Sequence, residues 1–216
     1  MKAGLDAIIK REQAEYLDRL LQQPDPLLLE MEKYAAEHRV PIADREVARF
    51  LEITARASRA TKALEIGMAI GYSVIHLARG MGRTGLVVTI EPNNDMIRAS
   101  TDFLTRAGLL EQVRIERGKA LEVMPKLPDS FDLLFIDAVK EEYRRYLDLG
   151  LERLHVGGVV IVDNLLWGGK VADRNEQSDS STLALRDFNH YFVNHPQLRA
   201  EVLAVGDGLG YAVKIG

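Results

Sequence analysis

The segment KALEIGMAIGYSVIHLAR, residues 62–79, decides the fold that this sequence predicts. It reads as a short apolar strand, Ala63–Ile66, then a turn, then an amphipathic helix, Tyr72–Arg79. Gly67 and Gly71 allow the backbone of that turn to approach a ligand closely. A strand, a turn and a helix in this order form the repeating unit of a parallel α/β sheet.

The same alternation continues toward the C-terminus. Further strands are expected at Leu86–Glu91, Val113–Glu116, Phe131–Asp137 and Val159–Asp163, and further helices at Asn94–Ala107 and Glu141–Leu154. The run Leu133–Ile136 is apolar on both faces, which is typical of a central strand that helices cover on both sides. Strands at Glu201–Val205 and Gly210–Lys214, joined by a Gly-Asp-Gly turn, predict an antiparallel hairpin. The sequence therefore predicts a doubly wound α/β sheet of seven strands, parallel except for this hairpin.

The first sixty residues differ because they read as helices only. One apolar stripe at helical spacing comprises Leu5, Ile8, Ile9, Tyr16, Leu17, Leu20 and Leu21. Pro26 suits the first turn of a second helix, which reaches about Arg39, and Asp44 is expected to cap a third. We therefore expect an N-terminal helical extension, residues 1–60, on the substrate or dimer side, and an α/β domain, residues 61–216.

Composition excludes several classes of protein. The 216 residues are 47% hydrophobic and 28% charged, so the chain is neither disordered nor fibrous. Without cysteine there can be no thiolate metal site, cysteine nucleophile or disulfide. The net charge of −4 provides no overall basic surface for nucleic acid. No apolar run approaches the ~20 residues of a membrane span, and MKAGLDAIIKREQ has no signal-peptide core. A cytoplasmic enzyme is expected.

The ends of the first two strands indicate an adenosine site, because ligands bind beyond the carboxyl ends of strands in open α/β sheets. The turn after the first strand lacks the dinucleotide fingerprint G-x-G-x-x-G, since Ala69 replaces its second glycine. Glu91 ends the second strand, where a carboxylate can accept hydrogen bonds from both hydroxyls of a ribose. Each feature alone could be structural, but together they favour adenosine binding.

The fourth and fifth strands end in oxygen-bearing side chains, Asp137 and Asp163-Asn164. Neighbouring strands lie ~4.8 Å apart, so these oxygens can converge. Two carboxylates and an amide oxygen suit Mg²⁺, although each Asp could also be a turn former or a helix cap. Lys140, three residues after Asp137, would reach the same site, where a nearby cation favours the neutral amine that a base needs.

One long polar connection, residues 168–181, follows the fifth strand. Its length and position are typical of a lid over a site. Trp167, immediately before it, could line the binding site of an aromatic substrate or pack against the lid, and the sequence leaves both interpretations open.

The chain resembles the cation-dependent, S-adenosylmethionine (SAM)-dependent O-methyltransferases of the catechol and caffeoyl-coenzyme A type. The matching segments are LEIGMAIGYS (64–73), VVTIE (87–91), FDLLFIDAVKEEYRRY (131–146), GGVVIVDNLLWGGKV (157–171) and VGDGLGYAVK (205–214). FIDA-x-K and GG-x-x-x-x-DN-x-x-W are specific to this group, and the match implies a Rossmann-like class I methyltransferase fold. KYAAEHRVPIA (33–43) and NHYFVNHP (189–196) are also similar to bacterial enzymes that methylate 5-hydroxyuridine in tRNA.

The resemblance implies roles for the matching residues. SAM would be bound by Glu65, Gly67, Tyr72, Ser73, Glu91, Ala120 and Asp137. Asp137, Asp163 and Asn164 would hold a divalent cation, and Lys140 would be the base that deprotonates the acceptor hydroxyl, with Asp137 as its catalytic partner. Val139 departs from the family, which often has Asp there, and this difference affects substrate fit more than metal binding. Members of the caffeoyl-coenzyme A type are commonly dimers, so we expect a homodimer.

The leading hypothesis is a Mg²⁺-dependent O-methyltransferase that acts on a catechol-like small molecule or on 5-hydroxyuridine in tRNA. The alternative is a non-catalytic adenosine- or RNA-binding module that retained the fold. The intact set Asp137, Lys140, Asp163 and Asn164 argues against that alternative. The missing glycine fingerprint and the C-terminal hairpin disfavour a nicotinamide oxidoreductase.

Overall fold

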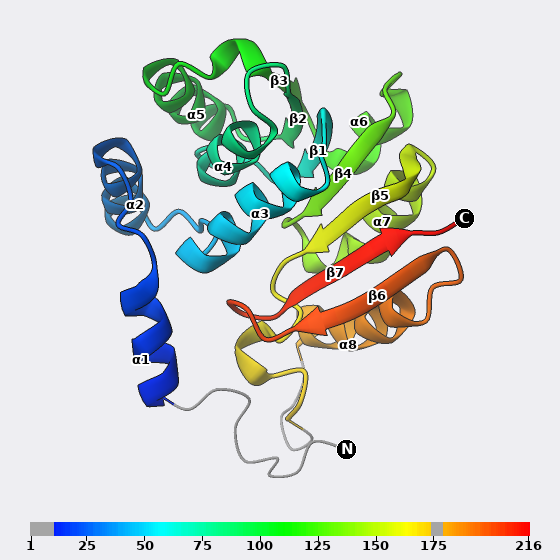
Figure 1. Ribbon diagram of the computed structural model, residues 1–216. Coiled ribbons are helices and arrows are strands. Elements are labelled where there is room, and N and C mark those ends of the chain that lie inside the picture. Colours follow the sequence, from blue (N-terminus) through cyan, green and yellow to red (C-terminus); the bar gives the residue numbers. More distant parts are fainter. Residues whose placement is uncertain (1–10, 174–178) are drawn as a thin grey trace.

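The computed structural model describes residues 11–173 and 179–216 and is built on one seven-stranded sheet (Figure 1). The strands are β1 (Lys62–Ile66), β2 (Leu86–Glu91), β3 (Val113–Arg117), β4 (Phe131–Ile136), β5 (Leu154–Val162), β6 (Leu198–Leu203) and β7 (Leu209–Lys214). Their order across the sheet is β3-β2-β1-β4-β5-β7-β6. β1 to β5 pair in parallel, and β7 is antiparallel to both of its neighbours. The predicted mostly parallel sheet with an antiparallel C-terminal hairpin is confirmed.

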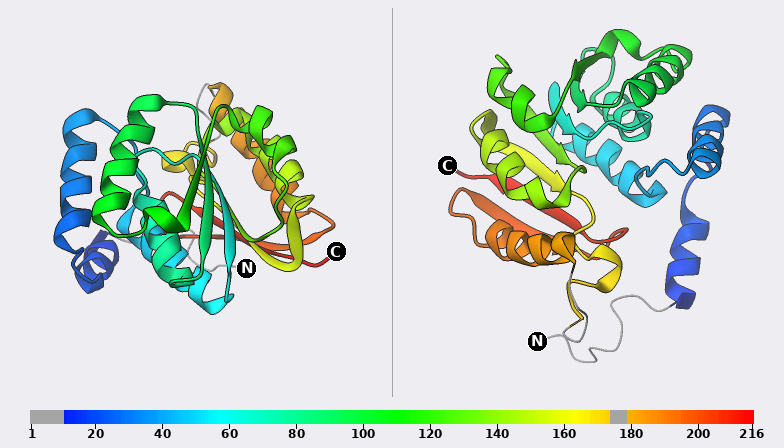
Figure 2. Two further views of the ribbon diagram at one scale, coloured as in Figure 1. Left: turned by 90° about the horizontal axis from the view of Figure 1, so that it is seen from above. Right: turned by 180° about the vertical axis from the view of Figure 1, so that it is seen from behind.

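Helices cover both faces of the sheet, as predicted (Figure 2). They are α1 (Arg11–Leu20), α2 (Pro26–His38), α3 (Arg45–Ala57), α4 (Tyr72–Met81), α5 (Asn94–Arg106), α6 (Ala120–Val123), α7 (Tyr143–Leu151) and α8 (Ser180–Val193). Short 3-10 helices are η1 (Leu110–Gln112), η2 (Met124–Lys126), η3 (Lys140–Glu142) and η4 (Trp167–Gly169). Within the described residues, none of these helices combines the length and apolar character of a membrane span.

The apolar run in β4 shows why two helical layers form. Leu133 and Phe135 face one core with α2 to α5, whereas Leu134 and Ile136 face the other core with α6 to α8. Alternate side chains of a strand point to opposite faces, so a strand that is apolar at every position needs cover on both sides. Each fully buried side chain of this kind stabilises the fold by roughly 1.5–3 kcal/mol.

Several element boundaries differ from the sequence-based expectation. The helix expected over Glu141–Leu154 begins as η3 and ends with α7 at Leu151, because Leu154 already pairs with β4 at the start of β5. β6 begins and ends earlier than the expected Glu201–Val205. α8 was not predicted, although its buried residues Leu185, Phe188 and Phe192 follow helical spacing.

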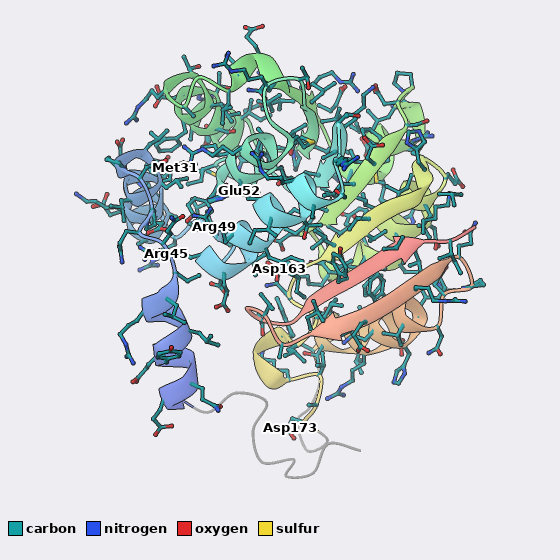
Figure 3. The ribbon with its side chains drawn as sticks, viewed as in Figure 1. Met31, Arg45, Arg49, Glu52, Asp163 and Asp173 are labelled. Carbon is teal, nitrogen blue, oxygen red and sulfur yellow. The ribbon has the colours of Figure 1, made fainter. Side chains whose placement is uncertain are left out.

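The N-terminal helices make different contacts. α2 begins at Pro26, as expected, and α3 packs along α4. Arg45 of α3 binds Glu32 of α2, with nitrogen–oxygen distances of 2.9 and 2.6 Å, and Arg49 of α3 pairs with Glu52 on the same helix (Figure 3). Asp44 occupies the N-cap position of α3, as predicted, but its side chain makes none of the expected cap hydrogen bonds.

α1 extends away from the sheet (Figures 1 and 2). Its apolar side chains Tyr16, Leu17 and Leu20 are exposed. Leu21, the next member of the predicted stripe, follows the end of α1 and is half-buried. The remaining members, Leu5, Ile8 and Ile9, lie outside the described residues. A division of the chain at residue 60 remains a prediction.

Candidate functional site

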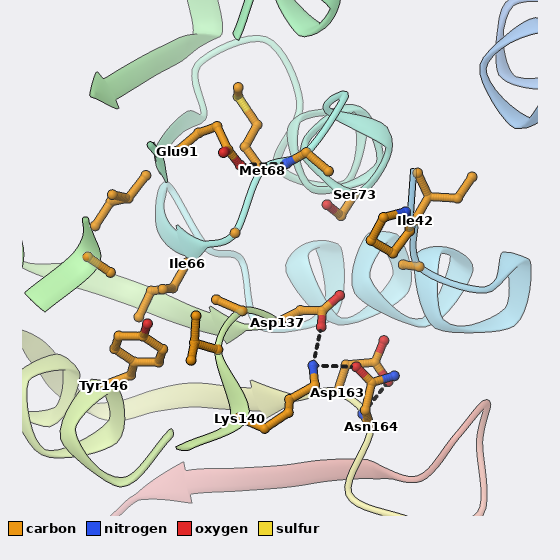
Figure 4. Close-up of a pocket in the computed structure, with 18 of the residues that line it drawn as sticks. Ile42, Ile66, Met68, Ser73, Glu91, Asp137, Lys140, Tyr146, Asp163 and Asn164 are labelled. Carbon is orange, nitrogen blue, oxygen red and sulfur yellow. Dashed lines mark hydrogen bonds and ion pairs between the residues drawn. The ribbon is translucent and has the colours of Figure 1, made fainter. Parts of the chain in front are cut away.

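A cavity of about 830 Å³ opens at the carboxyl ends of β1, β2, β4 and β5 (Figure 4). This is the position that a doubly wound sheet predicts, because the strand order reverses between β1 and β4. Its wall contains the predicted site residues Gly67, Tyr72, Ser73, Glu91, Ala120, Asp137, Lys140, Asp163 and Asn164. Glu65 is the one predicted site residue outside the wall.

The glycine turn after β1 brings the backbone close to the end of β4. Gly67 has a left-handed φ of +98°, and a Cβ there would lie 2.0 Å from the carbonyl oxygen of Asp137. Gly71 has a φ of +85° and directly precedes α4, which begins at Tyr72. A side chain at position 71 would collide with Ser100. Only glycine fits Gly67, because any side chain would collide with the neighbouring strand end.

Glu91 is held by the same turn. Its Oε2 accepts a hydrogen bond from the backbone N–H of Ala69 at 3.0 Å, and its Oε1 accepts one from Asn93 at 2.9 Å. A carboxylate has about four lone-pair sites, so acceptor capacity remains for a ligand in the cavity. The geometry suits the ribose-binding role that the resemblance implies.

Glu65 lies behind the cavity wall and is fully buried. Its two carboxylate oxygens accept hydrogen bonds from the hydroxyls of Ser73 and Thr89, both at 2.6 Å. Burial raises the pKa of Glu65 to about 7, because the charged form loses its hydration. Glu65 therefore orients Ser73, which is part of the wall.

Lys140 joins the ends of β4 and β5. Its ammonium donates to Asp137 Oδ1 at 2.9 Å and to Asn164 Oδ1 at 2.6 Å (Figure 4). It also donates to the Tyr143 hydroxyl at 2.6 Å. Tyr143 in turn donates to the carbonyl oxygen of Asp163 at 3.2 Å. The side chains of Asp137 and Asn164, two of the three that were predicted to converge, thus meet at one ammonium, and Lys140 and Asn164 are 24 residues apart in the sequence.

The oxygen cluster has the chemistry of a cation site. Asp163 is 2% exposed, and burial together with the charge of Asp137 raises its pKa well above the usual range. A cation bound beside the Asp163 carboxylate would lower this pKa again, because it favours the charged form. Among the described residues, no three His, Cys, Asp or Glu side chains form a metal-binding group. The candidate ligands are two carboxylates and the Asn164 amide, a set that suits a hard cation. Two of them, Asp137 and Asn164, already accept hydrogen bonds from the Lys140 ammonium.

Sequence reasoning missed several residues of this region, among them two tyrosines and two residues that precede α3. Tyr143 follows Lys140 by three positions, and Tyr146 follows by six, so helical spacing could have indicated that they face the same site. Ile42 and Asp44 line the cavity from the segment before α3, and no local pattern indicates this contact.

The geometry agrees with comparisons to known proteins. A family model described as O-methyltransferase matches residues 14–215. The chain is 31% identical over 209 residues to a catechol O-methyltransferase of Niastella koreensis, covering 92% of this chain and 94% of that protein. It is 34% identical over 192 residues to a catechol O-methyltransferase of Mycobacterium tuberculosis, covering 87% and 86%.

Solved structures show the same similarity. The O-methyltransferase TomG from Streptomyces achromogenes, in complex with SAM, superposes with a TM-score of 0.84 at 29% identity, covering 94% of this chain and 95% of that one. An O-methyltransferase from Bacillus cereus, in complex with S-adenosylhomocysteine (SAH), has a TM-score of 0.83 at 29% identity, covering 93% of this chain and 96% of that one.

Proposed function

The chain belongs to the O-methyltransferase family, and from this premise we propose that it transfers a methyl group from SAM to one hydroxyl of a catechol-like small molecule in a Mg²⁺-dependent reaction. The observation that carries the proposal is the convergence of Asp137, Lys140 and Asn164 beside the glycine turn, in one cavity. SAM-dependent O-methyl transfer is the activity of the family. The metal, the acceptor and the individual residue roles are the proposal.

SAM would bind along the ends of β1 and β2. Glu91 would hold the ribose hydroxyls, and Ala120, at the start of α6, would contact the adenine. The methionine end would lie against Gly67, Tyr72 and Ser73. This placement is supported by the position of all these residues in the wall of one cavity.

Asp137, Asp163 and Asn164 would hold the divalent cation. When bound, the cation would act as a Lewis acid that favours the ionised acceptor hydroxyl and orients it. The Asp137 and Asn164 oxygens now accept from Lys140. With Asp137, Asp163 and Asn164 holding the cation, Lys140 would stand beside a positive charge that favours its neutral amine, and the lone pair of that amine would accept the proton of the acceptor hydroxyl.

The transfer is an in-line displacement. The acceptor oxygen supplies the electron pair for the new oxygen–carbon bond, the carbon–sulfur bond breaks, and its electron pair remains on sulfur as the neutral thioether. The proton of the hydroxyl goes to Lys140. The task of the cavity is to hold the reacting atoms ~3–3.5 Å apart and in line, and to exclude water.

5-Hydroxyuridine in tRNA is the second candidate acceptor. One observation favours it: Pro41, Ile42 and Ala43, from the segment that is similar to tRNA-modifying enzymes, line the cavity. The net charge of −4 and the catechol O-methyltransferase relatives favour the small molecule. Binding to tRNA would fall steeply with salt, because phosphate contacts release counterions.

The test is methyl transfer from labelled SAM to a catechol and to tRNA carrying 5-hydroxyuridine, with Mg²⁺ or with excess EDTA. We expect product from the catechol, loss of activity in EDTA and recovery on Mg²⁺ addition. Asp163→Asn should abolish the Mg²⁺ response, whereas Asp187→Asn, an exposed Asp on α8, should not. Full activity in EDTA would contradict the role of the metal. Product from tRNA but not from the catechol would show that 5-hydroxyuridine, and not a catechol, is the acceptor.

We also propose that the chain forms a homodimer, a prediction that rests on the family resemblance. The exposed Tyr16, Leu17 and Leu20 of α1 support it, since an apolar helical stripe is normally covered. Sedimentation of the chain, compared with a Leu17→Glu variant, tests it: we expect a dimer that the substitution weakens.

A further inference from the structure

The segment that follows Asn164 forms one wall of the cavity. It carries Trp167, which lines the cavity and whose ring centroid lies 5.6 Å from the Lys140 nitrogen. The backbone is left-handed at Trp167 with a φ of +51°, then at Gly168 and Gly169. A left-handed conformation is unfavourable for a bulky residue such as tryptophan, so contacts elsewhere must hold this segment in place.

The β6–β7 turn holds the segment from one side. The backbone N–H of Leu165 donates to Gly208 at 2.8 Å, and that of Leu166 donates to Asp207 at 2.8 Å. The Asp207 carboxylate also accepts from the backbone N–H of Gly168 at 2.7 Å. These bonds fix the beginning of the segment but not its outer end.

α8 also holds the segment, and the side chain that reaches its outer part is Arg186. The Arg186 guanidinium donates to the carbonyl oxygens of Val171 and Lys170, both at 2.9 Å, and to that of Asp173. Asp173 is the outer end of the described segment, far from Asp163 at the sheet (Figure 3). Three carbonyls on one planar group define both the position and the orientation of the loop.

A second side chain of α8, Asn189, also binds this segment. It is three residues after Arg186, so the two side chains share one helix face. Its amide nitrogen donates to the carbonyl oxygen of Leu165 at 2.8 Å, just before Trp167. The two residues therefore bind the segment on both sides of Trp167.

α8 is itself attached next to the proposed base. Ser180 and Ser181, at its start, both donate to Glu141 at 2.8 Å, and Glu141 follows Lys140 directly. The Phe188 ring packs edge-on against the Tyr143 ring, with centroids 5.4 Å apart. α8 thus links the Lys140 region to the wall that carries Trp167.

We propose that Arg186 is a positioning residue that places Trp167, and through it the methyl acceptor, relative to Lys140. This inference rests on the proposed function, because it assigns the Trp167 side of the cavity to the acceptor. Arg186 lines no part of the cavity. It acts through the backbone of residues 170–173. Lysine cannot replace it fully, because one ammonium lacks the planar fork that reaches three carbonyls.

Trp167 is the single tryptophan of the chain, so its fluorescence reports on this segment alone. In Arg186→Ala we expect a red-shifted emission and stronger quenching by acrylamide. We expect kcat/KM for the acceptor to fall by about 10- to 100-fold, since small misplacements have effects of this size. The dissociation constant of S-adenosylhomocysteine should stay within about twofold, since Arg186 does not contact that end of the cavity.

Two further variants make the test specific. Arg186→Lys should recover part of the acceptor kinetics, and added guanidinium ion should partly restore Arg186→Ala. The matched control is Arg83→Ala: Arg83 is exposed, precedes β2, and makes no hydrogen bond or ion pair within residues 11–173 and 179–216. It should behave as wild type in every measurement.

The outcomes separate the inference from the proposed function. Wild-type fluorescence and acceptor kinetics in Arg186→Ala, with an active wild type, would overturn the inference. Equal losses for acceptor and for S-adenosylhomocysteine would overturn it also, because they indicate general disruption. If Arg186→Ala does not fold, the same measurements on Arg186→Lys decide. A wild type that methylates no acceptor defeats the proposed function, while the fluorescence still tests the contact between Arg186 and the Trp167 segment.

Discussion

Replacing Glu65 by Gln should stabilise the protein at alkaline pH and leave its stability almost unchanged at acidic pH. Glu65 is fully buried and accepts two hydroxyl hydrogen bonds, from Ser73 and Thr89. Burial of the carboxylate raises its pKa to about 7 from 4.5. The Gln amide keeps the shape and can bond both hydroxyls after they rotate, but it carries no charge.

The sign and size follow from proton linkage. Between pH 4.5 and 7 the folded state binds more protons at Glu65 than the unfolded state does, so stability falls as the pH rises through this window. The difference in pKa corresponds to about 3 kcal/mol of lost stability above pH 7. The free energy of unfolding of Glu65→Gln minus that of wild type should therefore increase by about 2–3 kcal/mol between pH 5 and pH 8.

Urea unfolding followed by circular dichroism measures this difference, with EDTA present and without SAM. Other titrating groups cancel, because they are shared by wild type and variant. Glu122→Gln, at an exposed position of α6, is the control and should show no pH-dependent difference. A Glu65→Gln difference that is constant within about 0.5 kcal/mol from pH 5 to pH 8 would refute the reasoning, since a shifted pKa requires it to change.

Other variants test the packing of the turn and the support of Lys140. Gly67→Ala should lower the free energy of unfolding by at least about 2 kcal/mol in urea, because its Cβ meets the Asp137 backbone. Gly108→Ala, after the end of α5 with a left-handed φ of +68° but open space, should cost only about 1 kcal/mol. Tyr143→Phe removes the hydroxyl that Lys140 contacts at 2.6 Å. It should lower kcat about tenfold, because one lost hydrogen bond to the base is worth about 1–1.5 kcal/mol, without changing S-adenosylhomocysteine binding in calorimetry. An unchanged kcat would contradict the role of Tyr143.

Local patterns in the sequence determined most of the fold. Alternation of apolar strands with amphipathic helices from residue 62 onward predicted the parallel sheet, and two strands around Gly-Asp-Gly predicted the hairpin. These patterns are local because strand and helix periods are properties of a few adjacent residues. α8 was missed because a polar connection precedes it and its short apolar stripe is ambiguous without a face to cover.

The sequence also located the candidate site, because strand ends meet at one edge of a parallel sheet. Asp137, Asp163 and Asn164 were identified by this rule alone, and the structure brings Asp137 and Asn164 to the same Lys140 ammonium. Their roles in catalysis and metal binding stay predictions. The rule applies to positions at strand ends and says nothing about side chains that reach the cavity from elsewhere.

Tertiary structure alone decided those remaining contacts. Glu65 lies behind Ser73 because β1 is central and buried, so its carboxylate meets side chains of α4 and β2 and not the cavity. Asp44, which reads as a helix cap, lines the cavity instead. Arg186 reaches the backbone of Asp173, which is 13 residues before it in the sequence. Each contact depends on how whole elements pack against one another, and no short-range periodicity carries that information.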